Sequence, residues 1–302
     1  MNDLNRRTLM RGAALTAMGL GAGAALTGTA SATGTGRGHG HGHDHGRGHG
    51  HGHGYGRVPR SAISIQLYSL RDLLAVDLEG TLEKLAEIGY EKVELAGLHG
   101  RTAKQFRAIL NRHGLRATSG HVGVSDNWQA SLDDARTLGH RYIVHPYANF
   151  ATADEWRAFA DQLEPAGEAA RKAGLQFGYH NHAHEFARLP TGEVPFDFIT
   201  ATDRRLVHLE VDLYWAMTGG VDPVSLFHAH RGRIKQFHVK DRAADGSFTD
   251  LGTGTIDFPR IFSHGHEAGV VEYIVERDTQ PDPLKTARVG YDYLRRVRFR
   301  RR

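Results

Sequence analysis

Acidic and histidine side chains end several apolar runs in the second half of the chain. They occur in the stretches 179–185 (YHNHAHE), 210–212 (EVD), 236–241 (QFHVKD) and 273–276 (YIVE). Carboxylates and imidazoles are the ligands that divalent metal ions such as Zn²⁺ and Mn²⁺ accept in proteins. If these four stretches converge in space, the sequence predicts a metal enzyme, and the rest of the chain is its scaffold.

The scaffold is indicated by short apolar runs that recur between longer amphipathic stretches. The runs are 63–68, 92–95, 115–121, 142–145, 175–180, 206–212, 234–239 and 271–275. The stretches between them place apolar residues at helical spacing, and several end in a glycine, which suits the left-handed backbone past a helix end. Eight strands and intervening helices within residues 61–294 predict an α/β fold, a (β/α)8 TIM barrel. A doubly wound open sheet is the alternative, but no glycine-rich phosphate motif follows the first run.

The working groups of such barrels lie where each strand meets the loop that follows it. The polar residues at these positions are, in strand order, Gln66 and Tyr68, Glu94, His121, His145, His180 and His182, Asp212, His238 and Lys240, and Glu276. Glu210 shares a strand face with Asp212 but sits deeper, which favours a structural role. Taken singly, His121 and His145 could also be hydrogen-bonded core histidines.

Four motifs in this order resemble the sugar phosphate isomerase/epimerase family, the xylose isomerase-like TIM barrels. They are YHNHAHEF at 179–186, VDLYW at 211–215, FHVKD at 237–241 and LGTGTIDF at 251–258, with a further match in SIQLYSL at 64–70. The resemblance covers residues 61 to about 292. It implies one divalent ion (Mn²⁺, Mg²⁺, Co²⁺ or Zn²⁺), held by Glu185, Asp212, His238 and Glu276. In the ketose epimerases of this family the first glutamate ligand lies within the fifth strand, but the corresponding stretch 177–180 contains no acid. His180 and His182 are therefore the alternatives to Glu185 as the first ligand.

The chemistry expected of such a site is that of a sugar isomerase or epimerase. An ion bound to adjacent carbonyl and hydroxyl oxygens acidifies the neighbouring C–H, and a carboxylate can then take the proton, which gives a metal-bound enediolate. We expect Glu185 and Glu276 to act as the acid/base pair. Further contacts with the sugar are expected from Tyr68, His121, His145, His180, His182, Trp215 and Lys240. Elimination begins with the same proton abstraction, so a metal-dependent lyase or hydratase acting on 3-keto-glycosides is the alternative.

Residues 1–32 have the pattern of a twin-arginine signal peptide. Arg6 and Arg7 precede an uncharged Gly/Ala/Leu stretch at 12–29, which ends at the small-residue cleavage site 30–32. An uncleaved anchor is the alternative, although an anchor needs about 20 strongly apolar residues. The sequence therefore predicts export through the twin-arginine machinery to the periplasm, cell envelope or exterior. The chain has no cysteine, which excludes a lipoprotein, disulfides and thiolate chemistry.

Residues 33–60 form a His/Gly-rich linker that we expect to be disordered, because so much glycine leaves nothing to bury. Its alternating histidines leave open a non-catalytic sugar- or metal-binding protein as a different class of function. Residues 295–302 form a basic tail that we expect to be solvated.

The basic character of the chain is confined to its ends. Of the net charge of +4, residues 1–32 hold +2, residues 33–60 hold +3 and residues 295–302 hold +6, so that −7 is left for residues 61–294. An acidic body is a poor partner for nucleic acid, which argues against a DNA-repair enzyme of the endonuclease IV type. The expected partner is a small sugar or keto-sugar, and a homo-oligomer is left open.

Overall fold

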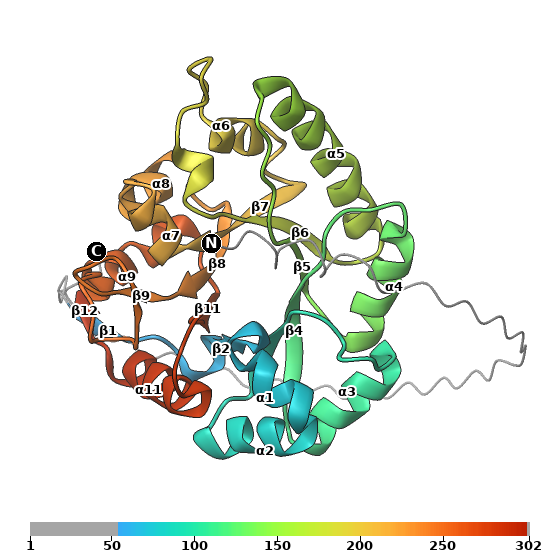
Figure 1. Cartoon of the computed structure of the whole chain (residues 1–302), viewed down its shortest axis with the longest axis vertical. Helices are drawn as coiled ribbons and strands as arrows, with labels where there is room; N and C mark the ends of the chain where they lie inside the picture. Colours follow the sequence, from blue (N-terminus) through green and yellow to red (C-terminus); the bar gives the residue numbers. More distant parts are fainter. Residues whose placement is uncertain (1–53, 301–302) are drawn as a thin grey trace, which may run out of the picture. The chain divides into compact units, whose positions relative to one another are not determined.

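Eight parallel strands form a closed barrel with helices around it, in a computed structural model that describes residues 54–300 (Figure 1). Around the barrel the order is β11, β2, β3, β4, β5, β6, β7 and β8. The strands are β2 Ile63–Gln66, β3 Lys92–Leu95, β4 Arg116–His121, β5 Tyr142–His145, β6 Gln176–His180, β7 Val207–Asp212, β8 Ile234–Val239 and β11 Glu272–Val275. The predicted (β/α)8 barrel is confirmed, and each predicted apolar run contains one of these strands.

The outer layer consists of helices that run back between successive strands. They are α1 Arg71–Val76, α2 Leu78–Ile88, α3 Ala103–Arg112, α4 Trp128–Leu138, α5 Ala153–Lys172, α6 Pro195–Thr200, α7 Leu213–Thr218, α8 Pro223–Ala229, α9 Phe258–Ser263, α10 Gly265–Ala268 and α11 Pro283–Arg296. Short 3-10 turns, η1 Arg60–Ala62, η2 Leu67–Leu70 and η3 His184–Phe186, and a small ribbon, β9 Asp241–Arg242 with β10 Phe248–Thr249, complete the connections. No helix of this part of the chain is long and apolar enough to cross a membrane.

Local sequence explains where helix α2 begins and ends. Asp77 begins α2, and its Oδ1 accepts a hydrogen bond from the Gly80 amide at 2.9 Å. Gly89 ends the same helix with φ of +116°, a conformation that only glycine adopts without strain. A Cβ at this position would lie 2.7 Å from the hydroxyl of Tyr291 on α11, so the glycine also lets two helices approach.

The interior of the barrel is polar instead of apolar. In β7 the side chains of His208, Glu210 and Asp212 share the inner face because residues two apart in a strand point the same way. The apolar residues between them face outward, toward the helices. Both sets are buried, so the strand is covered on its two faces. The same alternation places Gln236 and His238 of β8 inside. The barrel therefore carries its charged groups in its centre and its hydrophobic core between strands and helices.

A two-stranded ribbon joins the two ends of the described chain. β1 (Tyr55–Gly56) pairs antiparallel with β12 (Phe299–Arg300). The structured part is therefore longer at both ends than the predicted range 61–294, because backbone pairing orders segments whose composition alone suggested linker and tail. The predicted signal peptide and residues 33–53 lie outside the described residues.

Candidate active site

A pocket of about 390 Å³ opens at the carboxyl ends of the barrel strands. Its lining residues come from the carboxyl ends of seven of the strands and the loops that follow them, and are Tyr68, Ala96, His121, Pro146, Tyr147, His180, His182, Lys240, Glu276 and Asp278. The volume is sufficient for a six-membered sugar or cyclitol ring. The position agrees with the rule that barrel enzymes bind substrate at this face.

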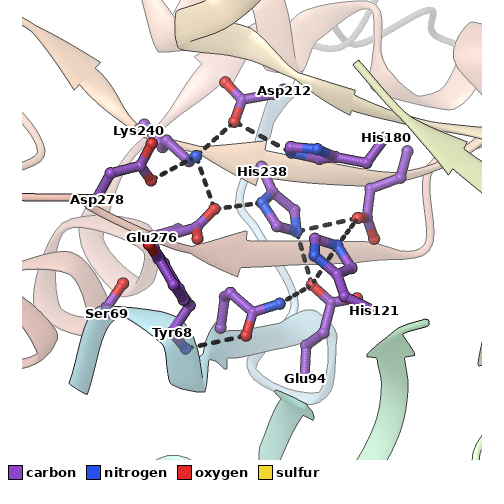
Figure 2. A network of polar contacts seen from close by, with 12 residues as sticks. Tyr68, Ser69, Glu94, His121, His180, Asp212, His238, Lys240, Glu276 and Asp278 are labelled. Atoms are coloured by element: carbon purple, nitrogen blue, oxygen red, sulfur yellow. Dashed lines mark hydrogen bonds and ion pairs between the residues drawn. The ribbon is translucent and has the colours of Figure 1, made fainter. Parts of the chain in front are cut away.

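Four buried ligand-type side chains converge on the floor of this pocket. They are His180 at the end of β6, Asp212 at the end of β7, His238 in β8 and Glu276 directly after β11, and one ligand atom of each lies within 4.8 Å of the others. His238 Nδ1 lies 2.5 Å from Glu276 Oε2, and His180 Nε2 lies 3.4 Å from Asp212 Oδ2. Figure 2 shows these groups pointing toward one another from three sides. We refer to these four residues as the upper cluster.

A second cluster lies beneath the first and shares His238 with it. Its members are Glu94, His121, Glu210 and His238. His238 Nε2 lies 2.6 Å from Glu94 Oε2 and 3.1 Å from Glu210 Oε1, and His121 Nε2 donates to Glu210 Oε1 at 2.7 Å. With Glu94 and Glu210 at Nε2 and Glu276 of the upper cluster at Nδ1, the His238 ring is held by carboxylates at both of its nitrogens (Figure 2). A side chain held this way has its orientation set before any ligand arrives.

The charges of the two clusters are set by burial and by mutual contacts. Burial alone would lower the pKa of His238, but the carboxylates of Glu210, Glu276 and Glu94 outweigh it and raise that pKa well above its usual value. Burial likewise opposes the ionisation of Glu276, yet Lys240 and His238 hold its pKa well below the ordinary range. Burial, assisted by the nearby His238, lowers the pKa of His180 to about 4. A neutral imidazole at His180 is the form that binds metal ions.

Lys240 is the cation of the pocket. Its ammonium lies 2.9 Å from Asp212 Oδ2, 2.8 Å from Glu276 Oε2 and 2.7 Å from Asp278 Oδ1. The side chain is almost fully buried, and its nitrogen lies 5.9 Å from the centre of the Trp215 ring. Three carboxylates around one ammonium satisfy all its donors, and they raise the Lys240 pKa well above its usual value against the effect of burial.

Glu185 is not a member of either cluster. Its Oε1 accepts a hydrogen bond from the Tyr179 hydroxyl at 2.8 Å and its Oε2 one from the His182 amide at 2.8 Å. The side chain is buried and does not line the pocket. The structure therefore assembles Asp212, His238 and Glu276 as the sequence predicted, and it places His180 beside them where Glu185 was expected.

The other expected substrate contacts divide into two groups. Tyr68, His121, His180, His182 and Lys240 line the pocket. His145 lies outside it: its Nδ1 accepts from the Val124 amide at 3.1 Å and its Nε2 donates to the Tyr147 carbonyl at 3.0 Å. The Trp215 ring lies tilted by 36° against that of His182, with 5.5 Å between the ring centres, and it is absent from the pocket lining. These two residues therefore support the pocket walls from behind.

Sequence reasoning missed Asp278 and Tyr147, which line the pocket. Asp278 lies in a bend three residues after β11 ends at Val275, and its signal in the sequence was a second carboxylate directly beyond the last strand. Tyr147 is 45% exposed and lines the pocket together with Tyr68, which is 42% exposed. It follows β5 by two residues, and only the loop conformation turns it toward the pocket.

Comparison with known proteins identifies the family of this chain. Residues 82–297 match a family described as "Xylose isomerase-like TIM barrel". The inosose dehydratase of Geobacillus kaustophilus (strain HTA426) is 28% identical over 295 residues, which cover 80% of this chain and 94% of that protein.

Among solved structures, a sugar phosphate isomerase/epimerase from Parabacteroides distasonis ATCC 8503 is 30% identical with a TM-score of 0.70, covering 78% of this chain and 98% of the other. The IOLI protein, whose crystal structure contains a zinc atom, has a TM-score of 0.61 at 16% identity, covering 76% of this chain and 95% of the other. The last likeness shows the fold alone.

Proposed function

Because the chain belongs to the xylose isomerase-like TIM barrel family, we propose that it is a metal-dependent enzyme acting on a polyhydroxylated ring ketone. The substrate class is a keto-cyclitol or a keto-sugar. The reaction that the pocket supports best is elimination of water or of another group β to the carbonyl. Isomerisation or epimerisation of a sugar is the second candidate.

The upper cluster is the proposed metal site. Two imidazoles and two carboxylates from four different strand ends form a mixed nitrogen and oxygen set, which suits Zn²⁺, Mn²⁺ or Co²⁺ better than Ca²⁺. The neutral state of His180 and the ionised state of Glu276 are the protonation states that ligands require, whereas His238, whose pKa is raised by its carboxylate partners, would release a proton on binding the ion. A divalent ion held there would polarise a substrate carbonyl and acidify the adjacent C–H.

Glu276 is the proposed base. Its side chain reaches the pocket from the end of β11 and is kept ionised by Lys240 and His238. It removes the proton next to the carbonyl, the C–H electron pair becomes a C=C bond, and the C–O bond to the β-hydroxyl breaks. The proton on Glu276 then leaves with the hydroxyl as water. Lys240 donates a hydrogen bond to the departing oxygen, while Tyr68 and Tyr147 flank the ring.

The distribution of carboxylates is the observation that favours elimination. Among the residues that line the pocket, the carboxylates are Glu276 and Asp278, and both follow β11. The wall across the barrel, after β5 and β6, presents Tyr147, His180 and His182. Epimerisation needs a proton acceptor on one face of the ring and a donor on the other, whereas elimination on a single face needs one base.

Two findings from the relatives bear on this choice. The curated inosose dehydratase relative supports elimination, and the isomerase/epimerase structure at 30% identity keeps proton transfer between carbons as the second candidate. The order of preference drawn from the sequence, isomerase before lyase, is therefore reversed in this proposal. We further propose that the enzyme works after twin-arginine export, where neutral sugars are better substrates than sugar phosphates.

The decisive experiment is the Glu276→Gln variant, tested with keto-inositols and 3-keto-glycosides in deuterated water. We expect wild-type protein to release a dehydrated or cleaved product, and the variant to lose at least about 1000-fold in rate with unchanged circular dichroism, because it lacks the base. Full activity in a folded variant would disprove the role of Glu276. A product of unchanged mass that carries deuterium at a second carbon or inverted configuration would instead establish the isomerase.

A further inference from the structure

The three carboxylates that hold Lys240 are not equivalent. Asp212 and Glu276 belong to the upper cluster, whereas Asp278 does not. The oxygens that Lys240 contacts are Asp212 Oδ2 and Glu276 Oε2. These same two atoms lie nearest to the imidazoles, 3.4 Å from His180 Nε2 and 2.5 Å from His238 Nδ1. The two oxygens that the Lys240 ammonium contacts are therefore the same two oxygens that face the proposed metal site (Figure 2).

Two cations at one pair of carboxylate oxygens repel each other. The repulsion is strong because Asp212, His238 and Lys240 are buried, and a low local dielectric leaves charges poorly screened. Asp278 offers the ammonium a partner that is not a proposed ligand. Its Oδ1 lies 2.7 Å from Lys240 Nζ, and it lines the same pocket with a side chain that is 22% exposed.

Resting on the proposed function, we infer that Lys240 exchanges partners when the ion binds: it leaves Asp212 and Glu276 and is retained by Asp278 alone. Asp278 is then a positioning residue, acting through Lys240. Two ammonium N–H groups become free for a substrate oxygen only in the metal-loaded protein. The exchange thus couples metal loading to the presence of a hydrogen-bond donor in the pocket.

A second consequence concerns the unloaded protein. With Lys240 on the two ligand carboxylates, their charge is compensated inside the barrel before any ion arrives, which a buried carboxylate pair requires. Lys240 therefore competes with the ion, and Asp278 weakens that competition. Removing the charge of Lys240 should therefore raise the metal affinity, and removing the charge of Asp278 should lower it. Opposite effects of this kind are not expected if the two residues only stabilise the fold or only bind the ion.

The test measures Mn²⁺ affinity of the full chain by the electron paramagnetic resonance signal of free Mn²⁺. Mn²⁺ is chosen because it binds imidazoles more weakly than later transition metals, which limits binding to the His/Gly-rich stretch 39–53. The Asp212→Ala variant measures any ion bound outside the upper cluster. Lys240→Met, Asp278→Asn, the double variant and the surface control Lys235→Met are compared with wild type.

We expect Lys240→Met to bind Mn²⁺ at least about tenfold more tightly and Asp278→Asn at least about tenfold more weakly. The double variant should match Lys240→Met, because Asp278 acts only through the lysine. Lys235→Met should match wild type. Unchanged or weaker binding in Lys240→Met, or a loss from Asp278→Asn that persists without the lysine, overturns the exchange while leaving the metal site in place. Equal Mn²⁺ binding by wild type and Asp212→Ala would overturn both the exchange and the proposed site.

Discussion

At the scale of single residues, the proposed set of metal ligands depends on which side chain lies at the end of β6. The stretch 179–186 offers His180, His182, His184 and Glu185 within six positions, and spacing alone cannot choose among them. The choice is made by the chain path, because β6 ends at His180 and the 3-10 turn η3 then carries Glu185 back toward Tyr179. Asp212, His238 and Glu276 could be predicted because each stands at or next to the carboxyl end of a strand, whereas Glu210 on the same face of β7 lies two residues deeper in the barrel.

The two candidate ligands can be separated by a pair of variants. His180→Ala should lower metal affinity at least about 100-fold, more than the loss typical of outer-shell partners, because it removes a proposed ligand. Glu185→Gln should keep the ion, since the amide preserves the shape of a side chain that bonds Tyr179 and the His182 amide. Metal content after gel filtration measures both. Loss of the ion in Glu185→Gln with retention in His180→Ala would return Glu185 to the ligand set.

At the scale of elements, all eight strands could be predicted because their apolar residues form short runs separated by helical patterns and glycine. What the runs did not reveal is how the polar residues between them pack inside the barrel. In β6, Gly178 faces the His208 ring of the neighbouring strand, and a Cβ on Gly178 would clash with Nε2 of that ring. The packing of a glycine in β6 against a histidine ring in β7 could not be predicted from the alternation of apolar and polar residues along either strand.

Gly178→Ala should therefore destabilise the protein. The added methyl group would meet three atoms of a buried ring, and overpacking of this kind costs about 1–3 kcal/mol in the free energy of unfolding. Urea unfolding followed by circular dichroism measures the change. Gly123→Ala is the control, because its nearest neighbour would be a His145 carbon at 3.8 Å, an ordinary contact. Equal stability of the two variants would contradict the proposed packing of His208 against β6.

At the scale of the whole molecule, several histidines are buried in neutral form. Burial lowers the pKa of His140, His145, His180 and His208 to about 4 each. The unfolded chain takes up these protons near pH 6.5, so the folded state loses stability as the pH falls from about 6.5 toward 4. His121 and His238, whose pKa values are raised, contribute stability that is fully present throughout this window.

His140→Leu tests this account outside the candidate site. Neither ring nitrogen of His140 has a hydrogen-bond partner among the described residues, so leucine removes a proton acceptor without breaking a bond. Between pH 7 and pH 5 the variant should gain about 2 kcal/mol in the free energy of unfolding relative to wild type. Urea unfolding at both pH values measures it, with His266→Leu at an exposed position as control. A wild-type pH dependence that persists in His140→Leu would show that the other buried histidines account for it.

The ribbon of β1 and β12 has a practical consequence for handling the protein. It joins the segment that leads into the first barrel strand to the segment that leaves α11, so both described ends lie at the amino-terminal face of the barrel, away from the pocket. Attachment to a bead or an electrode through residues adjoining either end would leave the pocket directed at the bulk liquid. Immobilisation by the ends, in contrast to random coupling through surface lysines, should then preserve access for substrate.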